Sequence, residues 1–350
     1  MTTPNTPVAD VRGSGTAKLT VSCVNPLDHA AEIKDLFVTH ERPEFPAFFD
    51  RAYPAAVAAG ACSWVGRDEG GRIRAHVVRF PRRFTFGGRP VSGALLGNLM
   101  VATPYRTFWP GVSLMRRAVA DLRDGPADFL YADPNELARP IAEAAGVRRV
   151  AELRRCVLLL GDRRLGVGAG VRAYRALRRW QAGGATLIAT ERAPGDEPGP
   201  EALAPLGDAQ ALRPVRDPSV YRARLGGYPT QSDRWFVFHR DDSPHTLVGR
   251  ALVRGPDAQG EAVLYVWECE PLSLLASLVA ALGDRLRQLG ATRLETYAMT
   301  GSEAEVELRR GGFLMRAERV PVFARAATEI GAAVVAAARA WRILTVDLDR

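Results

Sequence analysis

A strand, a short loop and a helix are predicted in succession between residues 98 and 124, and this unit constrains the fold more than any other stretch. The unit opens with an apolar, β-prone run at 99–101, breaks at Pro104, and resumes helical apolar spacing from Val112. The first turn of such a helix leaves backbone N–H groups without partners along the axis. This junction can therefore hold an anion, typically a phosphate.

The same segment resembles the acyl-CoA-binding motif of the GCN5-related N-acetyltransferases (GNAT), which reads V-x-P-x-x-R-G-x-G-x-G between a strand and a helix. The residues that echo this motif are Val101, Pro104, Arg106, Gly111 and Ser113. The spacing departs from the family pattern, because four residues separate Arg106 from Gly111 where the family usually has two. The bulky Phe108 and Trp109 lie among those four.

A second motif follows after the next predicted strand, 128–132. In the family this segment reads N-x-x-A, with a tyrosine seven residues after the asparagine and a Gly-Phe pair after that. The matching positions are Asn135, Ala138, Gly146 and Val147. Ala142 stands where many members carry the tyrosine that protonates the departing thiolate, so the motif leaves the general acid open. We expect a helix to begin at Asp133-Pro134-Asn135.

The rest of the first half indicates a mixed α/β domain around these motifs. One strand and two helices precede an antiparallel meander of three strands, expected at 61–67, 72–80 and 91–101. Gly97-Asn98 lies inside the third strand and predicts a β-bulge. In the resembling family, a bulge at this place exposes backbone groups to the pantetheine arm.

The second half repeats the order of the first. A hairpin, a third strand and the helix 272–289 are followed by a strand and a short helix that ends at Gly311-Gly312-Phe313. Its strand-to-helix junction has neither a Gly-rich turn nor an arginine, and Glu270 would repel a pyrophosphate there. We expect a degenerate second copy, with cofactor binding in the first half alone. A final helix, 326–341, and a final strand, 342–348, are expected to complete the second sheet.

The predicted fold class is therefore α/β, with an α+β mixed sheet: two tandem GNAT-like domains, each a twisted, mostly antiparallel sheet flanked by helices. The predicted parts are a disordered tail (1–16), an N-terminal acyl-CoA-binding domain (17–161), a connecting amphipathic helix (162–184) and a C-terminal degenerate domain (185–350).

Charge and cysteine content limit the partners. The formal net charge is +8, and lysine occurs only at Lys18 and Lys34, so nearly all basic residues are arginines. This sign favours an anionic cofactor such as CoA, and nucleic acid is not the expected partner. The four cysteines have no metal spacing, so we predict buried free thiols and no metal site. No signal peptide or membrane span is recognisable, which predicts a cytoplasmic protein without membrane insertion. A homodimer stays open.

The resemblance implies direct attack of an amine on the thioester of acetyl-CoA or another acyl-CoA. Such chemistry needs an anchored pyrophosphate, an oxyanion donor, a base and an acid. The predicted cofactor-binding residues are Leu99, Met100, Val101, Arg106, Gly111, Val112, Ser113 and Asn135. A free backbone N–H near Val101 is the implied oxyanion donor.

Three residues are candidates for the acid and the base. Tyr131 is the nearest sequence substitute for the missing tyrosine, although a tyrosine on a strand is more often part of a core. Glu44 lies in a loop that in the family often lines the acceptor pocket, and a surface position is the alternative for it. Asp133 is the other candidate base, with a helix-capping role as its alternative.

The predicted function is N-acyl transfer, most simply N-acetyl transfer, to a primary amine of a small molecule or sugar. One alternative is a Fem-type transferase that uses aminoacyl-tRNA, which would bind no CoA and would need a basic groove for RNA. The other is a non-catalytic GNAT-like binding protein, which Ala142 and the irregular 106–111 loop favour.

Overall fold

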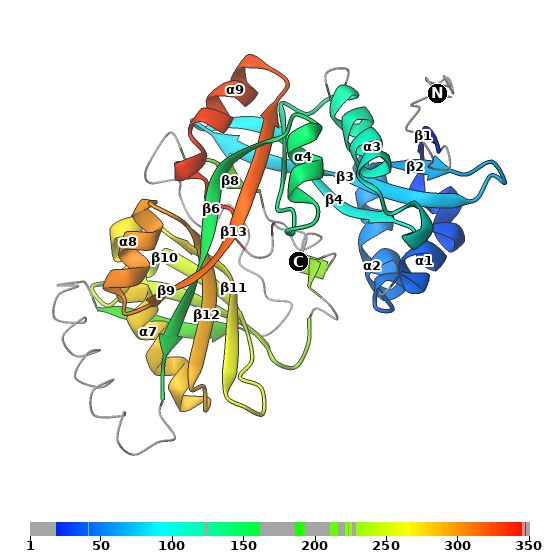
Figure 1. Cartoon of the computed structure of the whole chain (residues 1–350). Coiled ribbons are helices and arrows are strands. Elements are labelled where there is room, and N and C mark those ends of the chain that lie inside the picture. The colour runs from blue at the N-terminus through cyan, green and yellow to red at the C-terminus, as the bar shows by residue number, and fades with distance from the viewer. Residues whose placement is uncertain are drawn as a thin grey trace.

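The computed structural model of the chain (Figure 1) describes residues 19–40, 42–122, 125–161, 186–192, 211–215, 221–222, 224–225, 229–344 and 347. The predicted tail 1–16 and the predicted connecting helix 162–184 lie outside these residues. Among the described residues, no helix has the length and apolarity that a membrane crossing requires.

The described strands form one mixed sheet of 13 strands. Their order along the sheet is β1 (Thr20–Val24), β2 (Cys62–Arg67), β3 (Ile73–Phe86), β4 (Arg89–Val101), β5 (Phe129–Ala132), β13 (Leu314–Ala326), β6 (Arg148–Leu159), β12 (Arg293–Met299), β11 (Glu261–Cys269), β10 (Ser243–Arg254), β9 (Asp233–Arg240) and β7 (Leu187–Arg192), while β8 (Arg213–Pro214) pairs with β3. The predicted α/β class is confirmed. The two predicted sheets, however, are joined into one.

The joint is a reciprocal exchange of strands between the two halves. Strand β13 of the second half lies between β5 and β6, and β6 of the first half lies between β12 and β13 (Figure 1). The two exchanged strands pair antiparallel, from Leu314 opposite Val157 to Ala324 opposite Arg148. Each half therefore supplies a strand that the other half needs to complete its part of the sheet. The predicted boundary at residue 161 separates the two halves along the sequence, but the sheet continues across both halves.

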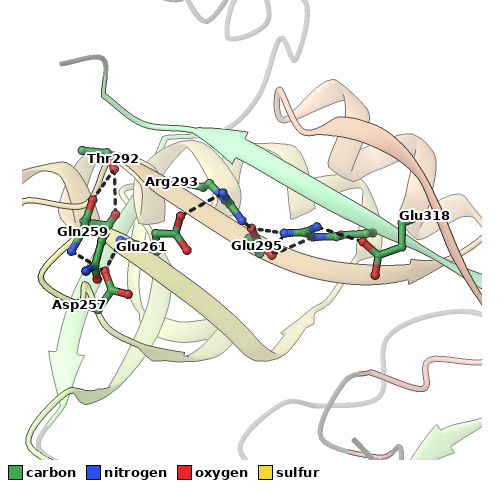
Figure 2. A network of polar contacts seen from close by, with 9 residues as sticks. Asp257, Gln259, Glu261, Thr292, Arg293, Glu295 and Glu318 are labelled. Atoms are coloured by element: carbon green, nitrogen blue, oxygen red, sulfur yellow. Dashed lines mark hydrogen bonds and ion pairs between the residues drawn. The ribbon is translucent and has the colours of Figure 1, made fainter. Parts of the chain in front are cut away.

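A row of ion pairs crosses this joint (Figure 2). The guanidinium of Arg155 on β6 contacts both carboxylate oxygens of Glu295 on β12, with Nη2 at 2.6 Å from Oε1 and 2.7 Å from Oε2, and its Nη1 lies 3.0 Å from Glu318 Oε2 on β13. Farther along the row, Arg293 contacts Glu261 on β11 at 3.0 Å. Opposite charges on neighbouring strands stabilise one register against its alternatives.

Helices cover both faces of the first half of the sheet. On one face lie α1 (Ala30–Thr39) and α2 (Phe45–Ala58), whose phenylalanines share a core with β3 and β5. On the other lie α3 (Phe108–Ala120) and α4 (Arg139–Ala144). In the second half, α7 (Leu275–Gln288) and α8 (Glu303–Arg310) pack together, and α9 (Glu329–Ala336) packs against β13.

The end of the chain differs from the expectation. The described residues 342–344 form no strand, and Asp347 lies in a helical turn. The segment instead returns to the first half, where the ring of Trp341 packs 5.6 Å from that of Phe129 and 6.4 Å from that of Tyr131. These aromatic contacts place the indole in the first-half core.

Candidate functional site

Strands β4 and β5 separate in the middle of the sheet. They pair in parallel over three positions, from Gly93 opposite Phe129 to Leu95 opposite Tyr131. Strand β5 ends at Ala132, whereas β4 continues to Val101. On the side of β5, no described strand pairs with β4 beyond Leu95, which leaves the backbone groups there for an extended ligand.

A β-bulge lies on this unpaired part of β4 and confirms the sequence prediction. His76 of β3 is opposite Met100, while Val78 is opposite Gly97, so β4 contains one extra residue. Asn98 has a φ of 51°, and it is the one residue other than glycine with positive φ in the described part of the chain. Such a conformation costs energy in a residue with a Cβ, so surrounding contacts must hold it.

His76 is one of the contacts that hold the bulge. Its ring is fully buried, with Nδ1 3.1 Å from the carbonyl oxygen of Asn98 and Nε2 3.0 Å from the hydroxyl of Ser63. Burial lowers the pKa of His76 to about 4, so the ring is neutral at physiological pH. Because a carbonyl only accepts, Nδ1 carries the proton and Nε2 accepts from Ser63. The histidine thus fixes the direction of one carbonyl in the bulge.

Tyr53 holds the bulge through the side chain of Asn98. The amide nitrogen of Asn98 donates to the Tyr53 hydroxyl at 3.1 Å. Tyr53 comes from α2 and is buried, with its ring stacked 4.0 Å from that of Phe49 and edge-on to Phe80 at 5.4 Å. Neither Tyr53 nor His76 was identified from the sequence, because the contacts join three segments that are distant along the chain.

The predicted cofactor residues of β4 lie beside this bulge. Leu99 and Met100 are half-buried, and Val101 is buried at the end of the strand. After the short helical turn η2 (Thr103–Tyr105), Arg106 is exposed, and its Nε donates to the Val101 carbonyl at 3.3 Å. The guanidinium therefore lies at the end of β4, as the resemblance implies.

The position of Gly111 corrects the sequence analysis. Helix α3 begins at Phe108, so Gly111, Val112 and Ser113 lie inside the helix, where their N–H groups bond the preceding turn. Gly111 instead allows close packing, since a Cβ there would lie 2.9 Å from Ile141 of α4. The sequence signal for the earlier start was Pro110, which is typical of a first helical turn.

The amide groups that α3 offers to a ligand are those of Phe108 and Trp109. Pro110 has no N–H, and the amide of Thr107 already donates to the Tyr105 carbonyl at 2.7 Å. Both aromatic side chains are exposed, by 42% for Phe108 and 48% for Trp109. Sequence reasoning treated these two residues as an interruption of the motif, whereas they form its helix start.

In the second motif, by contrast, the helix starts later than predicted. Helix α4 begins at Arg139, and the side chain of Asn135 accepts from the amide of Ala138 at 3.0 Å in the preceding turn. Ala142 is fully buried in the core between α3 and the sheet. The position of the family tyrosine therefore supplies no acid in this chain.

The three predicted catalytic residues are not brought together. Tyr131 is fully buried, its hydroxyl donates to the backbone carbonyl of Asp347 at 2.9 Å, and burial raises its pKa well above the ordinary value. Glu44 is exposed before α2; hydrogen bonds from its own backbone N–H and from Arg42 lower the pKa of this carboxyl. Tyr131 forms the last pair at the divergence, but its hydroxyl is buried away from it, whereas Asp133 is half-buried directly after β5.

The cysteines follow the prediction in part. Cys156 and Cys269 are buried and free, whereas Cys23 is exposed because β1 is an edge strand. A hydrogen bond from Cys23, together with the nearby Arg79 charge, lowers the pKa of Cys62 to about 7. The described residues contain no group of three or more His, Cys, Asp or Glu side chains that could hold a metal ion.

No protein-family model matches this sequence, and no curated protein matches it.

Solved structures are similar in fold. A probable N-acyltransferase of unknown function from Enterococcus faecalis V583 is 13% identical with a TM-score of 0.63, over 88% of this chain and 72% of that one. A GCN5-related N-acetyltransferase from Anabaena variabilis is 9% identical with a TM-score of 0.61, over 89% and 74%. A GCN5-related N-acetyltransferase from Kribbella flavida is 14% identical with a TM-score of 0.52, over 88% and 71%. The chain therefore has the GNAT fold.

Proposed function

We propose that the protein is an N-acyltransferase that moves an acyl group from acyl-CoA, in the first instance acetyl-CoA, to a primary amine of a small molecule or sugar. The divergence of β4 from β5 beside a bulge held by His76 and Tyr53 carries this proposal. A thioester placed there would lie along unpaired backbone groups of β4, which are suited to a developing oxyanion.

The cofactor would be held by two parts of the site. The backbone of β4 at 99–101 would bond the pantetheine arm, as an added strand does. Arg106 and the amides of Phe108 and Trp109 would bind the pyrophosphate, because the start of α3 carries positive partial charge. Gly111, Val112 and Ser113 would act through the packing of α3.

The reaction would proceed by attack of a neutral amine on the thioester carbonyl. The carbon–sulfur bond then breaks, CoA leaves as a thiolate, and the amine loses a proton. Asp133 is the proposed base because it is half-buried next to the divergence. Tyr131 is no longer proposed as the acid. Its hydroxyl is buried, donates to the Asp347 carbonyl and has a raised pKa, so it cannot protonate the leaving thiolate.

A non-catalytic acyl-CoA-binding protein is the second candidate. The observation in its favour is that Ala142 is buried in the core and Tyr131 is sealed, so neither position supplies an acid. Turnover with a panel of amines separates the two candidates, because a binding protein would bind acetyl-CoA without releasing free CoA thiol.

Calorimetry with acetyl-CoA tests the cofactor site. Trp109→Glu places a carboxylate at the exposed start of α3, and Ala120→Glu places the same charge at the exposed end of the same helix. We expect micromolar binding that weakens by about tenfold or more in Trp109→Glu and stays unchanged in Ala120→Glu. Absence of binding by the parent protein would overturn the proposal and direct the search to aminoacyl-tRNA.

A further inference from the structure

A cavity of about 530 Å³ lies at the end of β4 that is remote from the bulge. Its described lining comes from the second half of α2 and the two residues after it, from 79–83 of β3 and from 92–94 of β4, together with Pro126, Ala127, Val215 and Arg224. The bulge at Asn98 lies four residues beyond this part of β4 along the same strand. The cavity is therefore distinct from the proposed acyl-CoA site.

The cavity lies on an unpaired part of the edge of β3. Strand β2 pairs with β3 as far as Arg79, and β8 pairs with it again at Phe84 and Thr85. Between these contacts, the described strands leave residues 80–82 of β3 without a partner on this side. Pro81 lies in the middle of this stretch, where a missing N–H is tolerated because the edge is open.

The described lining of the cavity is strongly basic. Four of its residues are arginines and none is acidic: Arg79, Arg82, Arg83 and Arg224. Burial and repulsion by Arg224 and Arg254 lower the pKa of the neighbouring Arg51. Arg254 itself is paired with Asp233 at 2.7 Å. The field in the cavity therefore favours a negative charge.

Aromatic rings hold two of these guanidinium groups in place. Arg224 is 9% exposed, and its guanidinium lies 5.8 Å from the ring of Phe48 and 5.9 Å from that of Phe80. Arg82 lies 5.6 Å from the same Phe80 ring. The Phe80 ring thus contacts two guanidinium groups from distant segments. Guanidinium groups that are held in position in this way are suited to binding a carboxylate or a phosphate.

Another part of the lining is apolar and built from small side chains. It consists of Ala52, Ala55 and Ala56 of α2 and of Ala59 at the end of that helix. These methyl groups leave space beside the arginines, and the volume is within the range of metabolite sites. A ligand that fits both parts of the lining has a small apolar body and one anionic group.

We propose that this cavity binds a small anionic metabolite through Arg82 and Arg224, with a phosphate ester or a carboxylate as the charged group. The proposal does not depend on acyl transfer. Because Ala52 lines the cavity and the next residue, Tyr53, bonds Asn98, α2 connects a ligand in the cavity to the bulge.

The test uses inorganic phosphate in one arm and succinate in the other, titrated into the full chain by calorimetry at constant ionic strength. Arg82→Gln and Arg224→Gln remove one charge each from the cavity. Ala55→Glu adds a carboxylate at an exposed lining position, and Ala58→Glu is its control on the same helix, outside the described lining.

We expect millimolar or tighter binding of at least one anion, and the stronger arm identifies the charged group. The dissociation constant should rise about tenfold in Arg82→Gln, Arg224→Gln and Ala55→Glu, and stay unchanged in Ala58→Glu. Binding of acetyl-CoA should be unchanged in Ala55→Glu, which separates this proposal from the proposed function. If neither anion binds, or if the variants bind as the parent does, the proposal is overturned.

Discussion

Each half contains a pair of parallel strands that diverge, but the contacts just beyond the last paired residues differ between the halves. In the first half β4 and β5 pair over three positions, and in the second half β11 and β12 also pair over three. Just beyond the last pair, Thr296 of β12 donates its hydroxyl to the Leu264 carbonyl of β11 at 3.0 Å, and this bond is buried. The equivalent position on β5 is Ala132, which has no donor. In the second half, a single side-chain hydroxyl therefore connects β12 to β11 at the point where the two strands diverge.

The strand-to-helix junctions differ in the same sense. The first half presents the exposed Arg106 ahead of α3. The second half presents Glu270, which is 4% exposed and ion-paired with Arg213 and, at 2.6 Å, with Arg342. A buried carboxylate at this place opposes an anionic ligand. The comparison teaches that a few polar side chains decide whether the same strand divergence is accessible to an anionic ligand. We call the first half, with Arg106 at its junction, the open half, and the second half, with Thr296 and Glu270, the sealed half. This difference supports cofactor binding in the first half alone.

The largest expected effect concerns the buried histidine of the open half. Burial lowers the pKa of His76 from its ordinary value near 6.5 to about 4, so protonation favours the unfolded chain. The contribution of His76 to the free energy of unfolding is therefore fully present above about pH 6.5. About 3 kcal/mol of this free energy is lost as the pH falls toward 4. Urea unfolding across this range measures it.

The control for this test is His76→Leu, which lacks the titrating ring. The variant should show a shallower loss of unfolding free energy between about pH 6.5 and pH 4 than the parent. It should also slow acyl transfer, since the Asn98 carbonyl loses its donor, and His76→Asn should restore part of the rate. Equal pH slopes in parent and His76→Leu would contradict the assigned role.

The next effect concerns the sealed half. Glu270→Gln removes the carboxylate that Arg213 and Arg342 share, and leaves two partly buried cations without their partner. We expect the free energy of unfolding to fall by about 2 kcal/mol. Chemical denaturation measures the change. Glu303→Gln, at an exposed position of α8, is the control and should change it by less than about 0.5 kcal/mol. A similar small change in Glu270→Gln would show that the junction is not held by this carboxylate.

A single hydroxyl can also be introduced into the open divergence. Ala132→Thr places a threonine where the second half has Thr296. We expect it to bond the Leu96 carbonyl and to weaken acetyl-CoA binding about tenfold. The matched change, Thr296→Val, removes the hydroxyl from the sealed divergence and should leave acetyl-CoA binding unchanged. Calorimetry on both variants tests the comparison, and weakening in Thr296→Val alone would reverse it.

The smallest effect is expected at Glu44. Its carboxylate is exposed and bonded to Arg42 at 2.6 Å, outside the divergence. Glu44→Gln should therefore change turnover by less than about twofold and stability by less than about 0.5 kcal/mol. Steady-state kinetics with an amine acceptor measures the first quantity. A large loss of turnover would return Glu44 to the mechanism as a base.

Local patterns predicted most of the described elements of both halves and the bulge, but not the end of the chain, where the expected strand 342–348 is not formed. The bulge at Asn98 depends on residue types within a few positions, and it is present in the structure. The start of α3 was placed too late, because Gly111 was interpreted as a ligand contact and Pro110 was not used. Its glycine serves helix packing against Ile141.

The polar contacts of the site and the strand exchange were beyond the sequence pattern. His76 lies in a continuous run of buried residues on β3, and its partners Ser63 and Asn98 lie on other strands. Likewise, the alternation along β6 is the same whether its neighbour is β5 or β13. Pairing partners far apart in the chain are decided by the whole sheet, and the sequence pattern of one strand contains no record of them.

The exchange of β6 and β13 has a consequence for biosynthesis. Strand β13 ends at Ala326, so the first half lacks its neighbouring strand until the residues up to 326 have left the ribosome. During translation, β5 and β6 present open edges that can pair with other chains. The sheet of the first half can therefore be completed only after β13 of the second half has been made. Premature termination in the second half would leave the first half without a complete sheet, although every residue of its proposed acyl-CoA site had been made.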